Sequence, residues 1–362
     1  MLPSERGNQL VAGSRPTQRQ IAEEAGVSRT TVSLVLNDVP GVHISPETRQ
    51  RVLEVARRLN YYPDAAARTL ASGRTHTIGF VLCQSPDRIF ADAFLPEVLR
   101  GVGDAVQENG FRVLIHSVED VTAPDAYIGL AREKHADGII LSGPRSDDDQ
   151  LPHLKAEGFP MVLLGQLPGS GIPFVDVDNV GAARQAVEHL IGLGHRRVGM
   201  ITNAPLEYTA ARDRLAGYRQ VLEKAGLSFD EGLVRYGDFR EESGRVGMDQ
   251  LLDLPEPPTA VFVACDLVAF GALEAIKERN LTVPGDIALV GFDDVRLAHY
   301  VDPPLTTVRL PAYELGYRAA TLLTQLISGA TSEEQGILLQ TELVVRQSCG
   351  ATSHRSSSEE GR

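Results

Sequence analysis

Residues 17–37 of the chain read TQRQIAEEAGVSRTTVSLVLN, a pattern that predicts two short helices joined by a tight turn. Thr17 and Gln20 fit a capping box, in which the threonine side chain accepts the amide of Gln20 and the glutamine side chain accepts the amide of Thr17. Gly26 suits the left-handed backbone of the turn, and Ser28 is a preferred cap for the second helix. The stretch therefore predicts a helix, a turn and a second helix in direct succession.

The expected second helix, residues 28–36, has an apolar side and a mainly polar side. Four residues would face away from the apolar interior: Arg29, Thr30, Ser33 and Leu34. A third helix is expected from residues 45–46 to about residue 59, because a serine followed by a proline suits a helix start.

Two short helices joined by Ala-Gly-Val-Ser fit the helix-turn-helix motif, whose second helix enters the major groove of DNA with its amino terminus first. The alternative is a three-helix bundle without a ligand. The outward residues of the second helix are mostly short, polar or basic, unlike the Glu/Lys mixture of an idle surface. This difference favours DNA binding.

The distribution of charge supports the same interpretation. The whole chain has a formal net charge of −13, which by itself disfavours a nucleic-acid partner. Residues 1–75, however, hold ten arginines and seven acidic residues, a net of +3, so the remaining chain carries −16. A basic head on an acidic body predicts that one end of the chain meets phosphate.

Residues 64–75 separate the predicted head from the rest of the chain. Asp64 could cap a helix of two turns, but an isolated helix of that length is marginal in water. The segment is therefore predicted to be a linker whose helix forms only when a partner packs against it.

From residue 77 onward, short apolar runs alternate with helical segments. The strand candidates are residues 78–82, 112–116, 138–141, 161–164, 198–201, 260–263 and 287–290. The helical stretches include residues 96–109, 182–193, 215–224 and 267–279. This alternation predicts parallel sheets covered by helices, in two doubly wound lobes of about 130 residues each. Ligands of such folds bind in a crevice at the carboxyl ends of the strands.

The order of several motifs resembles the lactose-repressor/galactose-repressor family over roughly residues 17–350. In the head, the matching motifs are residues 21–37, 47–52, 60–63 and 67–70. In the body, they are residues 174–179, 193–198, 214–218, 237–239, 265–266, 283–287, 291–294 and 304–308. The resemblance implies a cytoplasmic, homodimeric repressor that binds palindromic operator DNA. It also implies a small-molecule effector, bound between two lobes of the periplasmic-binding-protein type, that controls operator affinity.

The resemblance also implies the site residues. The DNA-binding positions fall on Ser28, Arg29, Thr30, Ser33, Leu34, Asn37 and Leu70. Among them, Arg29 and Thr30 take base-reading positions, and Leu70 takes that of a hinge-helix leucine that wedges into the minor groove. The ligand-binding positions fall on Phe94, Arg214, Phe239, Cys265 and Asp293.

A guanidinium and a carboxylate that face one cleft can hold vicinal hydroxyls from the donor and the acceptor side at once. This chemistry gives Arg214 and Asp293 a role in gripping the effector, with Phe239 stacking on a ring. Simpler interpretations stay open for each residue. Arg214 could pair with an acid on a helix face, Phe239 could be plain core, and Asp293 could cap a turn.

The chain departs from the family pattern in ways that bear on specificity. Leu34 stands where a basic or polar base reader is common, and the turn over residues 37–45 is two residues longer than the commonest form. Cys265 stands where asparagine is usual, and Leu95 where a second aromatic residue is common. Tyr208 stands where a purine-sensing relative has arginine, which favours a sugar or polyol over a purine as the effector.

Other classes of protein find less support. The chain has no GxSxG, HExxH or Walker motif, so no enzyme is predicted. Its three cysteines and nine histidines show no metal-ligand spacing, so neither a metal nor a cofactor is predicted. No apolar run approaches the ~20 residues of a membrane helix, and no export signal is visible. The alternatives are a solute-binding protein of a transport system, which would have an export signal and no head, and a purine- or nucleoside-responsive regulator.

The predicted organisation divides the chain into five parts. They are a disordered tail (1–16), a helix-turn-helix domain (17–63), a hinge helix with linker (64–75), a two-lobed ligand-binding and dimerisation domain (76–350) and a second disordered tail (351–362). The second tail contains no heptads, so a tetramer assembled by a coiled coil is not expected.

Overall fold

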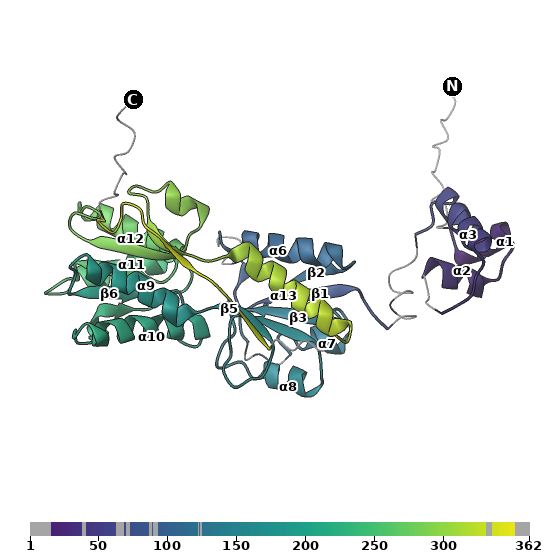
Figure 1. Cartoon of the computed structure of the whole chain (residues 1–362), viewed down its shortest axis with the longest axis horizontal. Helices are drawn as coiled ribbons and strands as arrows, with labels where there is room; N and C mark the ends of the chain where they lie inside the picture. The colour runs from purple at the N-terminus through teal and green to yellow at the C-terminus, as the bar shows by residue number, and fades with distance from the viewer. Residues whose placement is uncertain are drawn as a thin grey trace, which may run out of the picture. The chain divides into compact units, whose positions relative to one another are not determined.

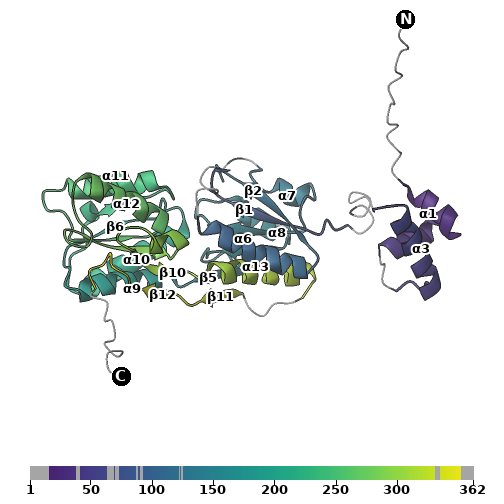
Figure 2. The same cartoon turned by 90° about the horizontal axis from the view of Figure 1, so that it is seen from above.

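The computed structural model of the chain divides into two compact units, Met1–Thr75 and His76–Arg362 (Figures 1 and 2). The described residues are 16–37, 41–62, 73–86, 93–121, 125–330 and 335–351, together with residues 69, 89 and 123. Leu70, the predicted hinge-helix leucine, lies outside the described residues, and so do the predicted tails apart from residues 16 and 351.

The described part of the first unit contains the helices α1 Gln18–Ala25, α2 Arg29–Leu36 and α3 Pro46–Arg58. The predicted capping box is present: Gln20 N donates to Thr17 Oγ1 at 3.3 Å, and Thr17 N donates to Gln20 Oε1 at 2.8 Å. Gly26 has a φ of 65° at the turn. Ser28 Oγ then accepts the amide of Thr31 at 3.0 Å and starts α2. The local pattern therefore forms the helices that it predicted.

The three helices enclose a small apolar core made of Ile21, Ala22, Ala25, Val32, Val35, Val52, Val55 and Ala56. Two arginines of α3 connect this helix to α1. Arg51 Nε donates to Ala25 O at 2.9 Å, and Arg58 forms an ion pair with Glu24. Together with the core, these contacts fix the face that α2 presents to solvent.

The first lobe of the second unit is built on a six-stranded sheet in the order β11-β5-β4-β3-β1-β2, with parallel neighbours throughout. Its strands are β1 Thr77–Leu82, β2 Arg112–Ser117, β3 Gly138–Ser142, β4 Met161–Leu164, β5 Phe174–Val177 and β11 Gly336–Leu339. Its helices are α6 Leu95–Glu108, α7 Gly129–Arg132, α8 Gln150–Ala156 and α13 Ala312–Ile327. Alternate residues of β1 divide between the two faces: Ile78 and Phe80 belong to the core under α6 and α13, and Val81 to the core under α7 and α8 (Figure 1).

The second lobe has a six-stranded sheet in the order β12-β10-β9-β8-β6-β7, in which only β12 runs antiparallel to its neighbour. Its strands are β6 Val198–Ile201, β7 Val234–Arg235, β8 Ala260–Val263, β9 Ala288–Asp293, β10 Thr306–Arg309 and β12 Glu342–Val344. Its helices are α9 Asn179–Gly192, α10 Thr209–Lys224, α11 Glu241–Leu252 and α12 Asp266–Glu278, with short 3-10 turns at Glu231–Leu233 and Arg296–His299. Helices α9 and α10 cover one face of the sheet, and α11 and α12 cover the other.

The chain passes between the two lobes three times, and these crossovers decide where a ligand can lie. It crosses from β5 into α9, from β10 into α13, and from β11 into β12. The carboxyl ends of both sheets consequently meet at the boundary between the lobes, which is where open α/β sheets bind ligands.

All seven predicted strands are present, and the four predicted helical stretches correspond to α6, α9, α10 and α12. The strands that were not predicted are β5, β7, β10, β11 and β12. Their sequences contain few consecutive apolar residues, and the structure explains why. Polar side chains interrupt β5 and β10, β7 has only two residues, and β11 and β12 lie at sheet edges where much of each strand is exposed.

Two glycines on α6 differ in their surroundings and offer a test of the contact between α6 and α13. A Cβ atom at Gly101 would lie 2.0 Å from Tyr313 O, whereas one at Gly103 would meet nothing within 4 Å. Gly101→Ala should lower the free energy of unfolding by about 1–3 kcal/mol through overpacking. Gly103→Ala should raise it by about 0.5–1 kcal/mol, because alanine favours the helix. Chemical denaturation of the whole chain measures both; equal effects would contradict this packing.

Candidate functional site

The outward face of α2 is most exposed at its amino terminus. Of the predicted DNA-binding residues, Ser28, Arg29 and Thr30 are exposed, and Ser33, Leu34 and Asn37 are half-buried. Ser28 is engaged in capping the helix, and Asn37 Nδ2 donates to Ser33 Oγ at 3.2 Å. Arg29 and Thr30 are thus the exposed side chains at the helix start with donors that can reach a base edge or a phosphate.

A cavity between the two lobes brings together all five residues that were predicted to bind a ligand: Phe94, Arg214, Phe239, Cys265 and Asp293. Several polar residues that were not among those predicted also line it: Gln84, Ser142, Asp176, Asn179, Asn203 and Thr209. Most of these polar residues stand within two positions of the carboxyl end of a strand, as Gln84 does after β1 and Asn203 after β6. That position in the sequence is a signal that could have identified them.

Arg214 is buried at the centre of this arrangement. Its Nε donates to Asn179 Oδ1 at 2.9 Å, its Nη1 donates to Ala264 O at 2.6 Å, and its guanidinium lies 3.8 Å from the centre of the Phe292 ring. Burial lowers the pKa of Arg214, and the negative charge of Asp293 is the strongest influence that opposes this effect. Arg214 is therefore a cation inside the protein and not a partner in a surface ion pair.

A second buried charge lies next to it across the lobe boundary. Asp176, in β5 of the first lobe, accepts hydrogen bonds from Asn179 Nδ2 at 3.1 Å and from Gln166 Nε2 at 3.1 Å. Asn179 in turn accepts from Arg214, so one continuous chain of hydrogen bonds runs from the first lobe into the second. Burial is the main cause that raises the pKa of Asp176, to about 6.

Two aromatic residues of the second lobe form another wall of the cavity. The rings of Tyr208 and Phe239 meet edge to face with centroids 5.2 Å apart. Tyr208 reaches into the first lobe: its hydroxyl donates to the Cys83 carbonyl, and the Arg145 guanidinium lies 4.8 Å from its ring centre. Phe239 is partly buried but remains on the cavity lining, so plain core does not describe its position.

Two amide side chains on the cavity lining carry unsatisfied acceptors. Gln84 Oε1 and Asn203 Oδ1 are buried and accept no hydrogen bond from any described residue. A buried carbonyl oxygen without a donor costs about 1–3 kcal/mol. A ligand that brings hydroxyl groups would supply the missing donors.

A helix-turn-helix head joined to a two-lobed α/β body, with a polar cavity between the lobes, defines a DNA-binding regulator with an effector domain. Residues 17–64 match the family model of bacterial regulatory proteins of the lacI family, and residues 187–349 match that of the periplasmic binding protein-like domain. The chain is 38% identical over 337 residues to the HTH-type transcriptional regulator CelR of Thermobifida fusca, which covers 92% of this chain and 98% of CelR. The chain belongs to the LacI family of transcription regulators.

Solved structures agree with this assignment over nearly the whole length. A complex of the transcriptional regulator CelR with cellobiose has 37% sequence identity, covers 92% of this chain and 100% of that chain, and has a TM-score of 0.71. A lac repressor dimer bound to operator and the anti-inducer ONPF has 30% identity, covers 93% of this chain and 99% of that chain, and has a TM-score of 0.81. The predicted fold class and family are confirmed.

The same comparisons decide between the classes considered from the sequence. The relatives are transcription regulators, which confirms that the chain is a regulator and not an enzyme. The alternative of a transport solute-binding protein is wrong, because residues 17–64 match the regulator head. Within the described residues, no helix is long and apolar enough to cross a membrane, and no group of three or more His, Cys, Asp or Glu residues could hold a metal ion.

The raised pKa of Asp176 leads to a prediction about stability. The folded state holds this proton more tightly than the unfolded state, so the carboxyl stabilises the fold below about pH 4 and loses that contribution as the pH rises through about 6. The stability of the wild-type protein relative to Asp176→Asn should therefore fall by about 2 kcal/mol between pH 4 and pH 7.

Chemical denaturation at a series of pH values measures this difference. Asp253→Asn is the control, because the ion pair with Arg279 lowers the pKa of that exposed carboxyl and should give no fall in the same direction. Parallel pH profiles for the wild-type protein and Asp176→Asn would show that Asp176 does not hold a proton in the fold.

Proposed function

We propose that the chain is a homodimeric repressor that binds a palindromic operator through α2 and that a sugar in the inter-lobe cavity controls this binding. The observation that carries the proposal is the cavity itself, which gathers a buried cation, a carboxylate and unsatisfied amide oxygens in the body of a DNA-binding regulator. Because such a regulator must reach genomic DNA, we propose that it is located in the cytoplasm.

On the DNA side, the proposal assigns base reading to Arg29 and Thr30. Both are exposed at the amino terminus of α2, the part of a recognition helix that meets base edges. Ser28, Ser33, Leu34 and Asn37 would line the same groove. Leu70 would wedge into the minor groove, as the family resemblance implies.

On the effector side, the chemistry of the lining favours a sugar. Arg214 can donate to hydroxyl groups, Asp293 can accept from them, and Gln84 and Asn203 offer free acceptors. Phe94 and Phe239 provide apolar faces, which suit the C–H side of a sugar ring. CelR, a relative over nearly the whole chain, has been solved in complex with cellobiose, which makes a glucose disaccharide the first sugar to test.

The homodimer is supported by an exposed strand at a sheet edge. Strand β2 ends the first sheet, and its Leu114 and Ile115 are 37% and 50% exposed. Edge strands that carry apolar side chains aggregate unless another surface covers them. A second copy of the chain would cover this edge, and two heads would then read the two halves of a palindrome. The related lac repressor was solved as a dimer on its operator.

Operator reading can be tested at Arg29. An arginine bound to a guanine edge contributes about 1–3 kcal/mol of discrimination. Arg29→Ala should therefore weaken binding to a duplex obtained by in vitro selection by about 5- to 150-fold, with a much smaller loss on random DNA. Fluorescence anisotropy at fixed salt gives both constants, and Arg57→Ala, an exposed arginine on α3, is the control. Equal losses on both duplexes would reduce Arg29 to a phosphate contact.

Effector binding can be tested at Asp293. Calorimetry with cellobiose should give binding to the whole chain. Asp293→Asn should weaken that binding by about tenfold or more, because a hydrogen bond to a charged group contributes about 1.5–3 kcal/mol. Asp253→Asn, on an exposed ion pair of the same lobe, should leave it unchanged. Arg214→Met should also weaken binding, with thermal unfolding measured alongside because Arg214 is buried.

The same calorimetry tests the chemical class of the effector. Other disaccharides, monosaccharides and a panel of purine bases and nucleosides extend the measurement. Binding of a purine or nucleoside in place of every sugar would contradict the sugar assignment. Unchanged sugar affinity in both Asp293→Asn and Arg214→Met would show that the sugar binds elsewhere.

A further inference from the structure

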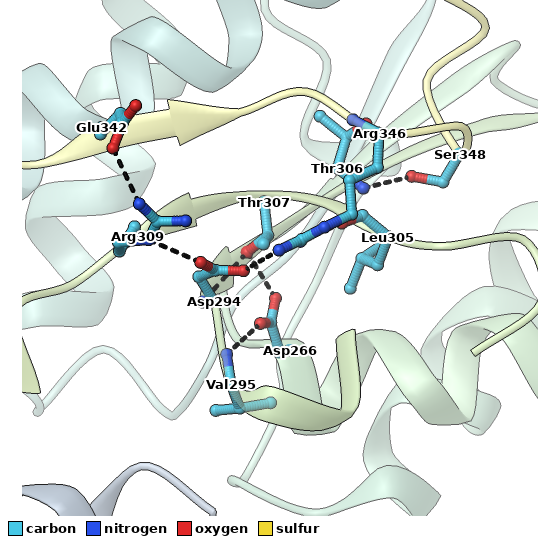
Figure 3. A network of polar contacts seen from close by, with 10 residues as sticks. All are labelled: Asp266, Asp294, Val295, Leu305, Thr306, Thr307, Arg309, Glu342, Arg346 and Ser348. Atoms are coloured by element: carbon cyan, nitrogen blue, oxygen red, sulfur yellow. Dashed lines mark hydrogen bonds and ion pairs between the residues drawn. The ribbon is translucent and has the colours of Figure 1, made fainter. Parts of the chain in front are cut away.

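Asp294, the residue after the cavity residue Asp293, is held by two arginines, Arg309 at the end of β10 and Arg346 two residues after β12 (Figure 3). Arg309 Nε donates to Asp294 Oδ2 at 2.7 Å, and Arg346 Nη2 donates to Asp294 Oδ1 at 2.6 Å. The side chains of Asp294 and Arg346 are only 8% and 15% exposed, so water screens this ion pair weakly, whereas Arg309 is 50% exposed. Each carboxylate oxygen thus has its own cationic donor.

Both arginines are fixed at their other ends as well. Arg346 Nη1 donates to Leu305 O at 2.7 Å, and Arg309 Nη1 donates to Glu342 Oε2 at 3.0 Å (Figure 3). The network consequently ties the residue after β9 to the end of β10, to the first residue of β12 and to the segment that follows β12. A buried carboxylate with two such partners is strongly ordered.

Two of the three crossovers between the lobes begin or end at this network. Arg309 is the last residue of β10, from which the chain passes through residues 310–311 into α13 of the first lobe. Leu310 N also donates to Asp293 O at 3.2 Å. Glu342 is the first residue of β12, which follows β11 of the first lobe by a short connection. The segment that carries Asp293 is therefore bonded directly to the first of these crossovers and, through Arg309, to the second.

The backbone at Asp293 and Asp294 adopts a conformation that side-chain-bearing residues rarely take. Their φ angles are 123° and 54°, two left-handed values in succession. Each such residue costs on the order of 1 kcal/mol or more and persists only where its surroundings over-determine it. The ion pairs of Asp294 supply such surroundings.

Asp293 also interacts with a buried cation, Arg214, and with a buried carboxyl group, Asp266. Arg214 attracts the Asp293 carboxylate. Burial first, and then the negative charge of Asp293, raise the pKa of Asp266 well above its usual range. Asp266 is fixed in turn, because Thr307 Oγ1 donates to it at 2.6 Å and Val295 N donates at 3.0 Å. Asp293 is thus bonded through its backbone to Leu310, is followed directly by the fixed Asp294, and interacts electrostatically with Arg214 and Asp266. A ligand that binds its carboxylate therefore acts on a residue connected to this network.

We infer that Asp294 is a positioning residue that holds Asp293 in the cavity. When a ligand displaces Asp293, Asp294 transmits that displacement to the crossovers at residues 309–312 and 339–342. The part that concerns the ligand rests on the proposed effector site. The link between the cavity segment and the crossovers is a property of the chain alone and can be tested without a ligand.

Hydrogen–deuterium exchange of the whole chain tests that link. Asp294→Asn keeps the shape of the side chain and removes its charge. Amide exchange should become about tenfold faster or more in three separate segments, residues 291–297, 309–312 and 340–345, with β8 unchanged. Glu342→Gln should accelerate exchange in the last two segments. Asp253→Asn, which removes an exposed ion pair with Arg279 far from any crossover in the sequence, is the matched control and should change none of them.

An increase confined to residues 291–297 in Asp294→Asn, or no increase, would overturn the inference, because Asp294 would then act only locally. A second measurement separates positioning from simple structural support. In the whole chain, Asp294→Asn should reduce the factor by which cellobiose changes operator affinity by about tenfold, while cellobiose affinity itself changes less. An unchanged factor would also overturn the inference. Failure of cellobiose to bind the wild-type chain would contradict the proposed effector. The exchange measurement alone would then test the link between the cavity segment and the crossovers.

Discussion

The body of this regulator depends on a guanidinium that is buried where its two lobes meet. Arg214 lies in an interior where a charge without partners would cost several kcal/mol. Its partners come from separate parts of the second lobe: Asn179 begins α9, Ala264 follows β8, and Phe292 lies in β9. The opposite charge of Asp293 adds to them. The need to keep this cation solvated by protein groups therefore fixes the geometry of the second lobe's side of the cavity.

The same cavity is costly for the fold, and these costs are consistent with a site that is built for a ligand. Asp176 is buried with a raised pKa, two amide oxygens lack donors, and Asp293 takes a strained backbone conformation. Each of these features lowers stability where apolar packing would raise it. The head contains none of this strain at its described helices, and its caps and core follow local preference.

The sequence predicted the head well, because its signals are local. The capping box of Thr17 and Gln20, the turn at Gly26 and the cap at Ser28 act within a few residues, so the pattern contains the cause of the structure. The parallel strands were predicted where they are apolar on both faces. Asp176, Asn179, Gln84 and the network around Asp294 were not predicted, because their surroundings come from other elements of the fold. Arg214 lies 35 residues from Asn179, and Arg346 lies 52 residues from Asp294. The family resemblance supplied Phe94, Arg214, Phe239, Cys265 and Asp293, and the structure places all five on one cavity.

The measurement that most directly tests the central claim is reciprocal linkage between the cavity and the head. The dissociation constant of the operator is measured with and without saturating cellobiose, and that of cellobiose with and without saturating operator. Because the two sites share one equilibrium, the account predicts that both constants change by the same factor, about 5- to 150-fold. Cellobiose that binds in the cavity and leaves operator affinity unchanged would contradict the claim that the cavity controls the head.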